Sequence, residues 1–182
     1  APADGSSAAL VQSGRDWANL HLTTPYEWAK RQVEPRLRSN GWRELTAGAD
    51  LLVIEALVRQ TDLEVDLDPE TLARTAAATL PALRLAGVAP EEVWKADGPD
   101  TLKQLVETLA RQYSQYLEAG KLYDEAVVFE RALDTLPESS APDLICGILD
   151  VVELPGRALA YVRAFAGRSL LPLQRIGRDN YG

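Results

Sequence analysis

The chain has 182 residues, 46% of them hydrophobic and 25% charged, a composition typical of a globular protein rather than a disordered one. Its net charge of −8 disfavours binding to nucleic acid phosphates and to anionic membrane surfaces. A single histidine, His21, and a single cysteine, Cys146, leave no disulfide and no cluster of soft metal ligands, so we expect neither a bound metal nor a cofactor.

No apolar run reaches the roughly 18 residues that a membrane-spanning helix needs, so we expect a soluble protein without a transmembrane segment. The compartment stays open. The chain fits a cytoplasmic protein, and it fits equally the mature form of an exported or organelle-targeted protein whose leader has been removed.

The first elements of the chain are predicted from helix-start signals. Residues 1–14 are small and polar and are typical of a flexible arm. Four later segments place a proline at or near the first helical position, most of them after a capping residue: Thr24-Pro25, Asp68-Pro69, Gly98-Pro99-Asp100 and Ser140-Ala141-Pro142. The helix that begins near Asp68 is expected to end at Gly87 and to be kinked or divided at Pro81.

Apolar periodicity between these starts is helical. A helix over about residues 42–60 is expected to be the central one and to bury Leu52, because apolar residues cover most of its faces. Further helices are predicted over 102–117, 144–152 and 159–165, and no convincing strand is found. The sequence therefore predicts an all-α protein, in which residues 15–168 form one compact domain of about seven to nine helices, either a bundle or a short α-solenoid with extended termini.

One segment has the spacing of a helical hairpin, carried by six residues: Leu109, Tyr116, Gly120, Phe129, Ala132 and Pro137. In this spacing residues 109–137 resemble a single tetratricopeptide repeat, with Tyr113 where that family has a glycine. The resemblance implies that Tyr116 and Phe129 fill the space between two antiparallel helices, and that the protein binds peptides or proteins. An ordinary helical hairpin would explain the spacing equally well.

Possible chemical sites have simpler explanations. The alternating acids Asp62, Glu64, Asp66 and Asp68 suit calcium, but Leu67 and Ala73 stand where the calcium loop needs glycine and glutamate, so a solvated connector is expected. Cys146 lies in an apolar run and is expected to be a buried, inert thiol, and His21 has no partner histidine. These residues indicate no particular reaction, and we expect a protein without catalytic activity.

The strongest global feature is a charge asymmetry. From Leu154 to Gly182 five arginines face one aspartate, a local net charge of +4, so the preceding 153 residues carry −12. Residues 169–182 are predicted to form a basic-apolar tail that either contacts a protein partner with an acidic or apolar surface or folds back on the acidic helices. The partner-binding residues predicted in and next to this tail are Arg168, Leu170, Leu171, Leu173, Arg175, Ile176, Arg178 and Tyr181.

The sequence thus predicts a non-enzymatic protein–protein interaction module, an accessory, assembly or scaffold subunit of a larger complex. Nucleic acid is not expected as a partner, and the oligomeric state is open. The alternative is a small all-α enzyme or ligand-binding protein with an aromatic pocket. That pocket would be lined by Trp28, Trp42, Trp94, Tyr113 and Tyr116.

Overall fold

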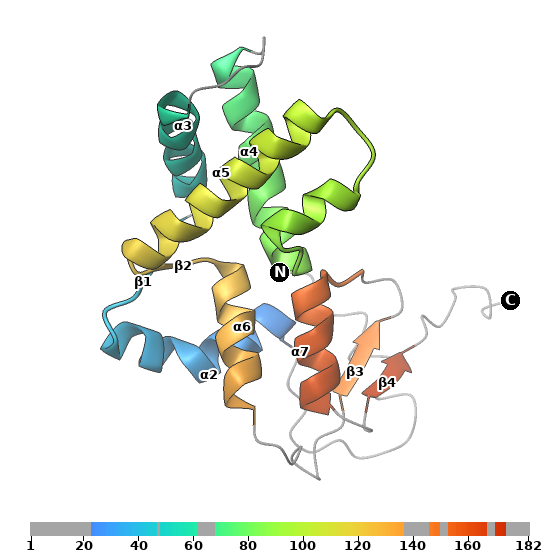
Figure 1. The fold of residues 1–182 in the computed structure, drawn as a ribbon. Helices are drawn as coiled ribbons and strands as arrows, with labels where there is room; N and C mark the ends of the chain where they lie inside the picture. The colour runs from blue at the N-terminus through green and yellow to red at the C-terminus, as the bar shows by residue number, and fades with distance from the viewer. Residues whose placement is uncertain are drawn as a thin grey trace, which may run out of the picture.

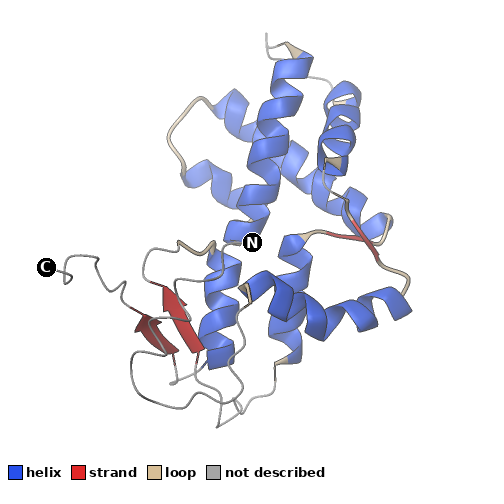
Figure 2. Ribbon diagram, turned by 180° about the vertical axis from the view of Figure 1, so that it is seen from behind, coloured by secondary structure: helices blue, strands red, loops and turns tan. Residues whose placement is uncertain are grey.

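The structure is a computed structural model that describes residues 23–46, 48–61, 68–136, 146–149, 153–166 and 170–173. Within these ranges the chain forms six α-helices, one 3-10 helix and four strands of two or four residues, so the all-α prediction is confirmed (Figure 2). No helix in the described ranges combines the length and the apolar character needed to cross a lipid bilayer.

The predicted helix starts are confirmed where the structure describes them. Helix α2 (Pro25–Ser39) is capped by Thr24, whose hydroxyl accepts a hydrogen bond from the amide of Glu27 at 3.1 Å. Helix α4 (Pro69–Ala86) is capped in the same way by Asp68. It is one helix with Pro81 inside it, and it ends at Gly87, whose φ of +80° is the left-handed conformation that glycine adopts without strain.

Three helices form a first lobe, which lies at the top of Figure 1. Helix α3 (Ala49–Gln60), α4 and α5 (Asp100–Ala119) pack around one hydrophobic cluster, and a 3-10 helix, η1 (Pro90–Lys95), packs on α5. The largest buried side chains of this cluster are Ile54, Leu80, Leu109, Tyr113 and Leu117. On α5 the buried residues Leu105, Leu109, Tyr113 and Leu117 recur every four residues, which explains why that helix buries one stripe.

A second lobe packs around a separate cluster. It consists of α2, α6 (Glu125–Thr135) and α7 (Gly156–Ala166), and its buried aromatic residues are Tyr123, Phe129 and Tyr161. Phe129 lies between Tyr26 and Tyr161, with ring centroids 6.3 and 5.7 Å away. The stacking of Tyr161 on Phe165 at 5.8 Å extends this aromatic core towards the end of α7.

The two lobes are joined by strands and by α4. Strand β1 (Arg43–Glu44) pairs in parallel with β2 (Leu122–Tyr123), so the chain entering the first lobe lies beside the chain leaving it. Helix α4 also contacts α6 and α7, and its Leu85 packs against the second cluster. The interface between the lobes is therefore formed by segments far apart in sequence, as Figure 1 shows.

The prediction for residues 42–60 is partly wrong. The helix begins only at Ala49, because residues 43–44 form β1 instead. Val53, Ile54, Leu57 and Val58 are buried as expected, but Leu52 is 68% exposed. Helix α3 thus lies at the edge of the first lobe, with α4 and α5 covering one side of it, rather than at the centre of the domain.

The hairpin implied by the tetratricopeptide resemblance is not supported. Helices α5 and α6 belong to different hydrophobic clusters, with β2 between them, so they do not share a common interface. Tyr116 is 47% exposed, while Tyr113 is fully buried in the first lobe, and Phe129 packs in the second. Ala132 is buried as expected, and Pro137 lies outside the described residues.

The prediction that no strands form, with a helix over 144–152, is also wrong. Strand β3 (Cys146–Leu149) pairs in parallel with β4 (Leu170–Leu173). A short apolar run can be a strand or a helix, and Gly147 together with the β-branched Ile148 favours the strand. The helix start expected at Ser140 and the arm at residues 1–14 lie outside the described residues.

Candidate functional site

The predicted binding residues of the C-terminal tail fall into two groups. Leu170, Leu171 and Leu173 lie in β4, opposite Cys146, Gly147 and Leu149 of β3. Arg168, Arg175, Ile176, Arg178 and Tyr181 lie outside the described residues, as does His21. The structure therefore pairs part of the tail with the chain itself and leaves the predicted arginine contacts untested.

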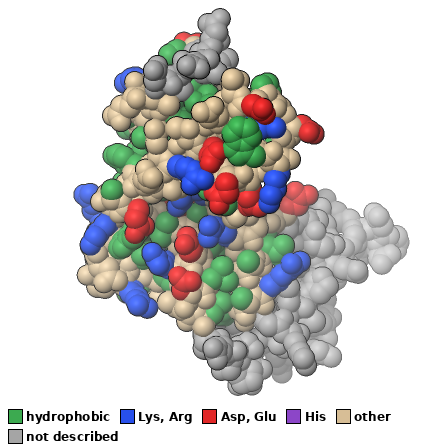
Figure 3. All heavy atoms as spheres, viewed as in Figure 1, with side chains coloured by type: hydrophobic (Ala, Val, Ile, Leu, Met, Phe, Trp, Pro, Cys, Tyr) green, Lys and Arg blue, Asp and Glu red, His purple; other side chains and the backbone are tan. Residues whose placement is uncertain are grey.

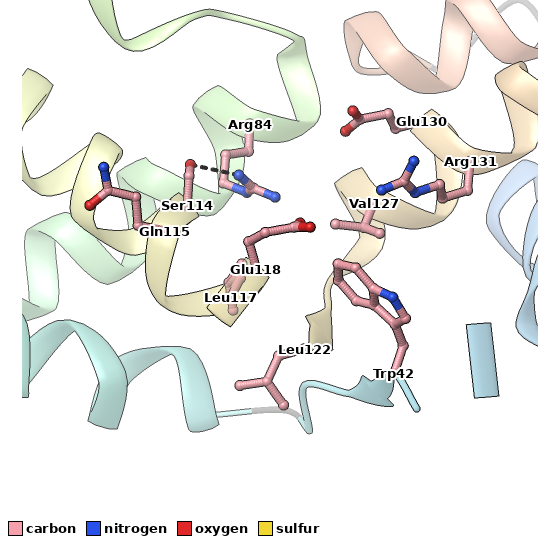
Figure 4. Close-up of a pocket in the computed structure, with 10 residues that line it drawn as sticks. All are labelled: Trp42, Arg84, Ser114, Gln115, Leu117, Glu118, Leu122, Val127, Glu130 and Arg131. Atoms are coloured by element: carbon pink, nitrogen blue, oxygen red, sulfur yellow. Dashed lines mark hydrogen bonds between the residues drawn. The ribbon is translucent and has the colours of Figure 1, made fainter. Parts of the chain in front are cut away.

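The described residues form a cleft where the two lobes meet, with a volume of about 320 Å³ (Figure 4). Its lining comes from α4 and α5 of the first lobe, from α6 of the second, and from Leu122 in β2 and Trp42 just before β1. The cleft is lined by Trp42, Arg84, Ser114, Gln115, Leu117, Glu118, Leu122, Val127, Glu130 and Arg131. Apolar side chains form part of the lining, and four charged side chains lie around them.

Arg84 is fixed in the wall of this cleft. Its Nε donates to Asp124 Oδ2 at 2.9 Å and its Nη1 donates to Ser114 Oγ at 2.7 Å, so one guanidinium joins α4, α5 and the start of α6. The Arg84 and Asp124 side chains are only 19% and 12% exposed. Asp124 also caps α6 by accepting from the amide of Val127 at 2.9 Å. The arginine therefore organises the meeting of three helices.

The guanidinium of Arg84 also lies over the aromatic ring of Tyr113. The Arg84 Cζ atom lies 5.8 Å from the ring centroid of Tyr113. Burial raises the pKa of Tyr113, and the nearby Asp124 carboxylate raises it further, so the phenol stays neutral. The Tyr113 hydroxyl is buried and has no hydrogen-bond partner in the described part of the chain. Arg84 is thus enclosed by groups that hold it rather than presented to solvent.

On the opposite wall, Arg131 and Trp42 form a second cation–aromatic contact. The Arg131 Cζ atom lies 5.9 Å from the ring centroid of Trp42, and an Arg131 Nη1 atom lies 3.7 Å from Asp134. Trp42 packs against the second hydrophobic cluster through part of its ring. A rigid aromatic surface and a guanidinium therefore stand at the mouth of the cleft.

A neighbouring cleft of about 310 Å³ shares Arg84, Ser114 and Glu130 with the first. Its other wall includes Gly87 and Arg157. The Arg157 Nε donates to the carbonyl oxygen of Arg84 at 2.7 Å, and its Nη1 lies 3.5 Å from Glu130 Oε2. Arg157 thus caps the C-terminal end of α4, where a cation is favourable. It also links α4 of the first lobe to α6 and α7 of the second.

The aromatic pocket proposed as an alternative does not assemble. Of its five residues only Trp42 lines either cleft. Tyr113 is in the core of the first lobe, Trp28 packs against Phe165 in the second, and Trp94 donates from its indole to Glu107 at 2.5 Å on the outside of α5. These residues therefore lie on separate elements and do not line a common cavity.

Sequence reasoning missed the cleft because its charged residues have ordinary surroundings in the chain. Arg84 stands in the last turn of α4, where a cation is expected on dipole grounds alone, and Arg131 stands in the middle of α6 with an acid, Asp134, three residues further on. The Gly87 and Asp124 caps were the signals that could have located the helix ends around it. Which ends meet is decided by the tertiary packing.

No group of three or more histidine, cysteine, aspartate or glutamate side chains within the described ranges is arranged to hold a metal ion. No family model, curated protein or solved structure matches this chain. The site must therefore be interpreted from its own geometry.

We expect the substitution Arg84→Met to destabilise the fold by about 2 kcal/mol, because it leaves Asp124 and Ser114 without their shared donor in a poorly solvated place. Denaturant unfolding would measure the change. The matched control is Arg74→Met, whose partner Glu70 is exposed like Arg74 itself, and it should cost less than about 0.5 kcal/mol. Equal losses for the two variants would contradict an organising role for Arg84.

Proposed function

We propose that this protein is a non-enzymatic protein–protein interaction module, an accessory or assembly subunit of a larger complex. The observation that carries the proposal is the cleft between the lobes, whose lining combines tryptophan, arginine and apolar side chains. Tryptophan and arginine are the residue types that contribute most strongly to protein interfaces. Arg84 is hydrogen-bonded within the wall and Trp42 packs against the second hydrophobic cluster, so binding would not need to order these two side chains.

The charge layout supports a protein partner over a nucleic acid. Charged side chains of both signs lie among apolar ones over the face shown in Figure 3. Arg84 pairs with Asp124, Arg131 with Asp134 and Arg157 with Glu130, so these cations are shared with the protein's own carboxylates. Phosphate recognition relies on cations that are free to contact the backbone.

The C-terminal tail is a second proposed contact region. Its support is the sequence pattern of arginines and leucines over 169–182, and the pairing of β4 with β3 adds an ordered base from which this segment begins. In this proposal the tail adds to the contact made at the cleft. The two regions can be separated by experiment, because removing the tail leaves the described lining of the cleft in place.

Binding of a small molecule is the second candidate function. A volume of about 320 Å³ is at the lower end of the roughly 300–1,000 Å³ found for small-molecule sites, and two arginines line it. We rank this function lower, because each of these arginines already has a carboxylate partner. A ligand retained by the purified protein and identified by native mass spectrometry would reverse the ranking.

Site-specific photo-crosslinking tests the proposed function. A benzophenone amino acid would replace Gln115, an exposed residue that lines the cleft, in the full chain expressed in its native cells. The control position is Ala78, which is exposed on α4 and lines neither cleft. We expect a defined covalent adduct with one protein from position 115 and none from position 78.

The same experiment in a chain ending at Gly167 tests the tail. A partner that crosslinks at position 115 in the full chain, and more weakly in the shortened chain, supports both contact regions. Equal crosslinking in the two chains would contradict the role of residues 169–182. No protein adduct from position 115 in either chain would contradict the proposed function.

A further inference from the structure

We propose that the partner presents a basic peptide segment to the cleft, and that one arginine or lysine side chain of this segment pairs with Glu118. This inference rests on the proposed function and specifies the chemistry of the partner. Three features support it: the charges of the cleft, the position of Glu118 on its helix, and the apolar side chains beside it.

The charges around the cleft cancel in pairs except for one. The Arg84 guanidinium is bound by Asp124, the Arg131 guanidinium lies near Asp134, and Glu130 is 3.5 Å from Arg157. The Glu118 side chain lines the cleft, is exposed, and makes no hydrogen bond or ion pair with the described residues. The cleft therefore holds one carboxylate, that of Glu118, without an ion-pair partner, and the ligand group complementary to it is a cation.

The place of Glu118 on its helix is unfavourable for folding. It lies in the last turn of α5, which ends at Ala119 and has no basic residue in that turn. A carboxylate at a helix C-terminus faces the negative end of the helix dipole, which disfavours the helix. A residue that disfavours its own helix and has no ion-pair partner is better explained by binding than by stability.

The apolar part of the lining fits the stem of a basic side chain. Val127 of α6 lies across the cleft from Glu118, and Leu122 of β2 lines it on the side of the first cluster. Figure 4 shows Glu118 reaching from α5 towards α6. Long basic side chains bury their methylene groups on apolar surface and keep the charge at a polar rim. The ring of Trp42, which also lines the cleft, already contacts the guanidinium of Arg131, so an aromatic face suited to planar cations is present.

Selection from a phage library of random heptapeptides tests the proposal on the folded full chain. We expect the selected peptides to be enriched in arginine and lysine over the starting library. Selection against the Glu118→Lys variant should lose this enrichment. The control is Asp97→Lys, which makes the same change of charge at an exposed residue that lines neither cleft, and it should leave the enrichment intact.

A quantitative test uses one selected peptide labelled with fluorescein. We expect Glu118→Gln to weaken its binding about fivefold at low salt, and less at high salt, because the pair is partly screened. Replacing the peptide's arginine by citrulline should weaken binding to the wild-type chain to a similar degree and leave binding to the variant unchanged. The melting temperature of Glu118→Gln should be equal to or above that of the wild type, which excludes unfolding as the cause.

Three results would overturn the inference: no enrichment of basic residues, enrichment that survives Glu118→Lys, or selected peptides that crosslink at position 78 but not at position 115. If crosslinking in cells still yields a protein partner at position 115, only the chemistry assigned to that partner fails. If that adduct is missing as well, the proposed function fails with it. The two failures are therefore distinguishable.

Discussion

The substitution Ile54→Asp is expected to unfold the protein at ambient temperature. Ile54 is fully buried among the three helices of the first lobe, so the variant would bring an unpaired carboxylate into an apolar cluster. Such a burial costs about 4 kcal/mol or more, a large part of the 5–15 kcal/mol of a typical domain. Loss of the helical circular dichroism signal, or a fall in the denaturant midpoint, would measure it.

Leu52→Asp provides the matched control on the same helix. Leu52 is two residues away from Ile54 in α3 but 68% exposed, so its carboxylate would remain in water. We expect a change in the free energy of unfolding of less than about 0.5 kcal/mol. Similar losses for the two variants would contradict the orientation of α3, because they would mean that both faces of this helix are covered.

Local signals predicted the beginnings and ends of the elements well. Thr24 and Asp68 cap their helices through side-chain oxygens, and Gly87 takes the left-handed conformation that ends α4. These features depend on residues within a few positions of one another, so the chain alone determines them. The helix over 102–117 was also predicted correctly, and α5 buries Leu105, Leu109, Tyr113 and Leu117 on one face.

The predictions failed where distant segments compete for the same surface. Helix α3 is apolar on several faces, and periodicity cannot tell which face a neighbour will cover, so Leu52 was misplaced. The pairing of residues 43–44 with 122–123 crosses nearly eighty positions of sequence and shortens the predicted helix at its start. The division into two cores, which creates the cleft, follows from such long-range contacts and has no local signature.

The candidate site was not predicted for the same reason: it depends on contacts between residues far apart in sequence. Glu118 carries a signal that sequence reasoning could have used, since an acid in the last turn of a helix is locally unfavourable. Whether its side chain has an ion-pair partner within the described ranges, however, depends on how α4, α5 and α6 pack together, which the sequence does not give. The three arginines of the clefts likewise have no distinctive sequence surroundings. Their ion pairs with Asp124, Asp134 and Glu130 could be identified only from the three-dimensional structure.

The contact between the lobes depends on a glycine at the start of α7. A Cβ atom placed on Gly156 would lie 2.2 Å from the carbonyl oxygen of Ala86 and 3.1 Å from its carbonyl carbon. Both are backbone atoms at the end of α4, which cannot rotate away as a side chain would. Because Arg157 next to it donates to the Arg84 carbonyl at 2.7 Å, this close approach fixes α7 against α4 beside the cleft.

We expect Gly156→Ala to destabilise the protein by about 3 kcal/mol, since the two backbones must separate to admit the methyl group. Gly48→Ala is the control: Gly48 has a φ of +82° but open space around it, so its cost of about 1 kcal/mol would come from backbone strain alone. Thermal unfolding measures both, and hydrogen exchange should show weakened protection in α7 for Gly156→Ala. A cost no larger than that of Gly48→Ala would mean that α7 does not approach α4 this closely, and the second cleft would then lose the wall formed by Gly87 and Arg157.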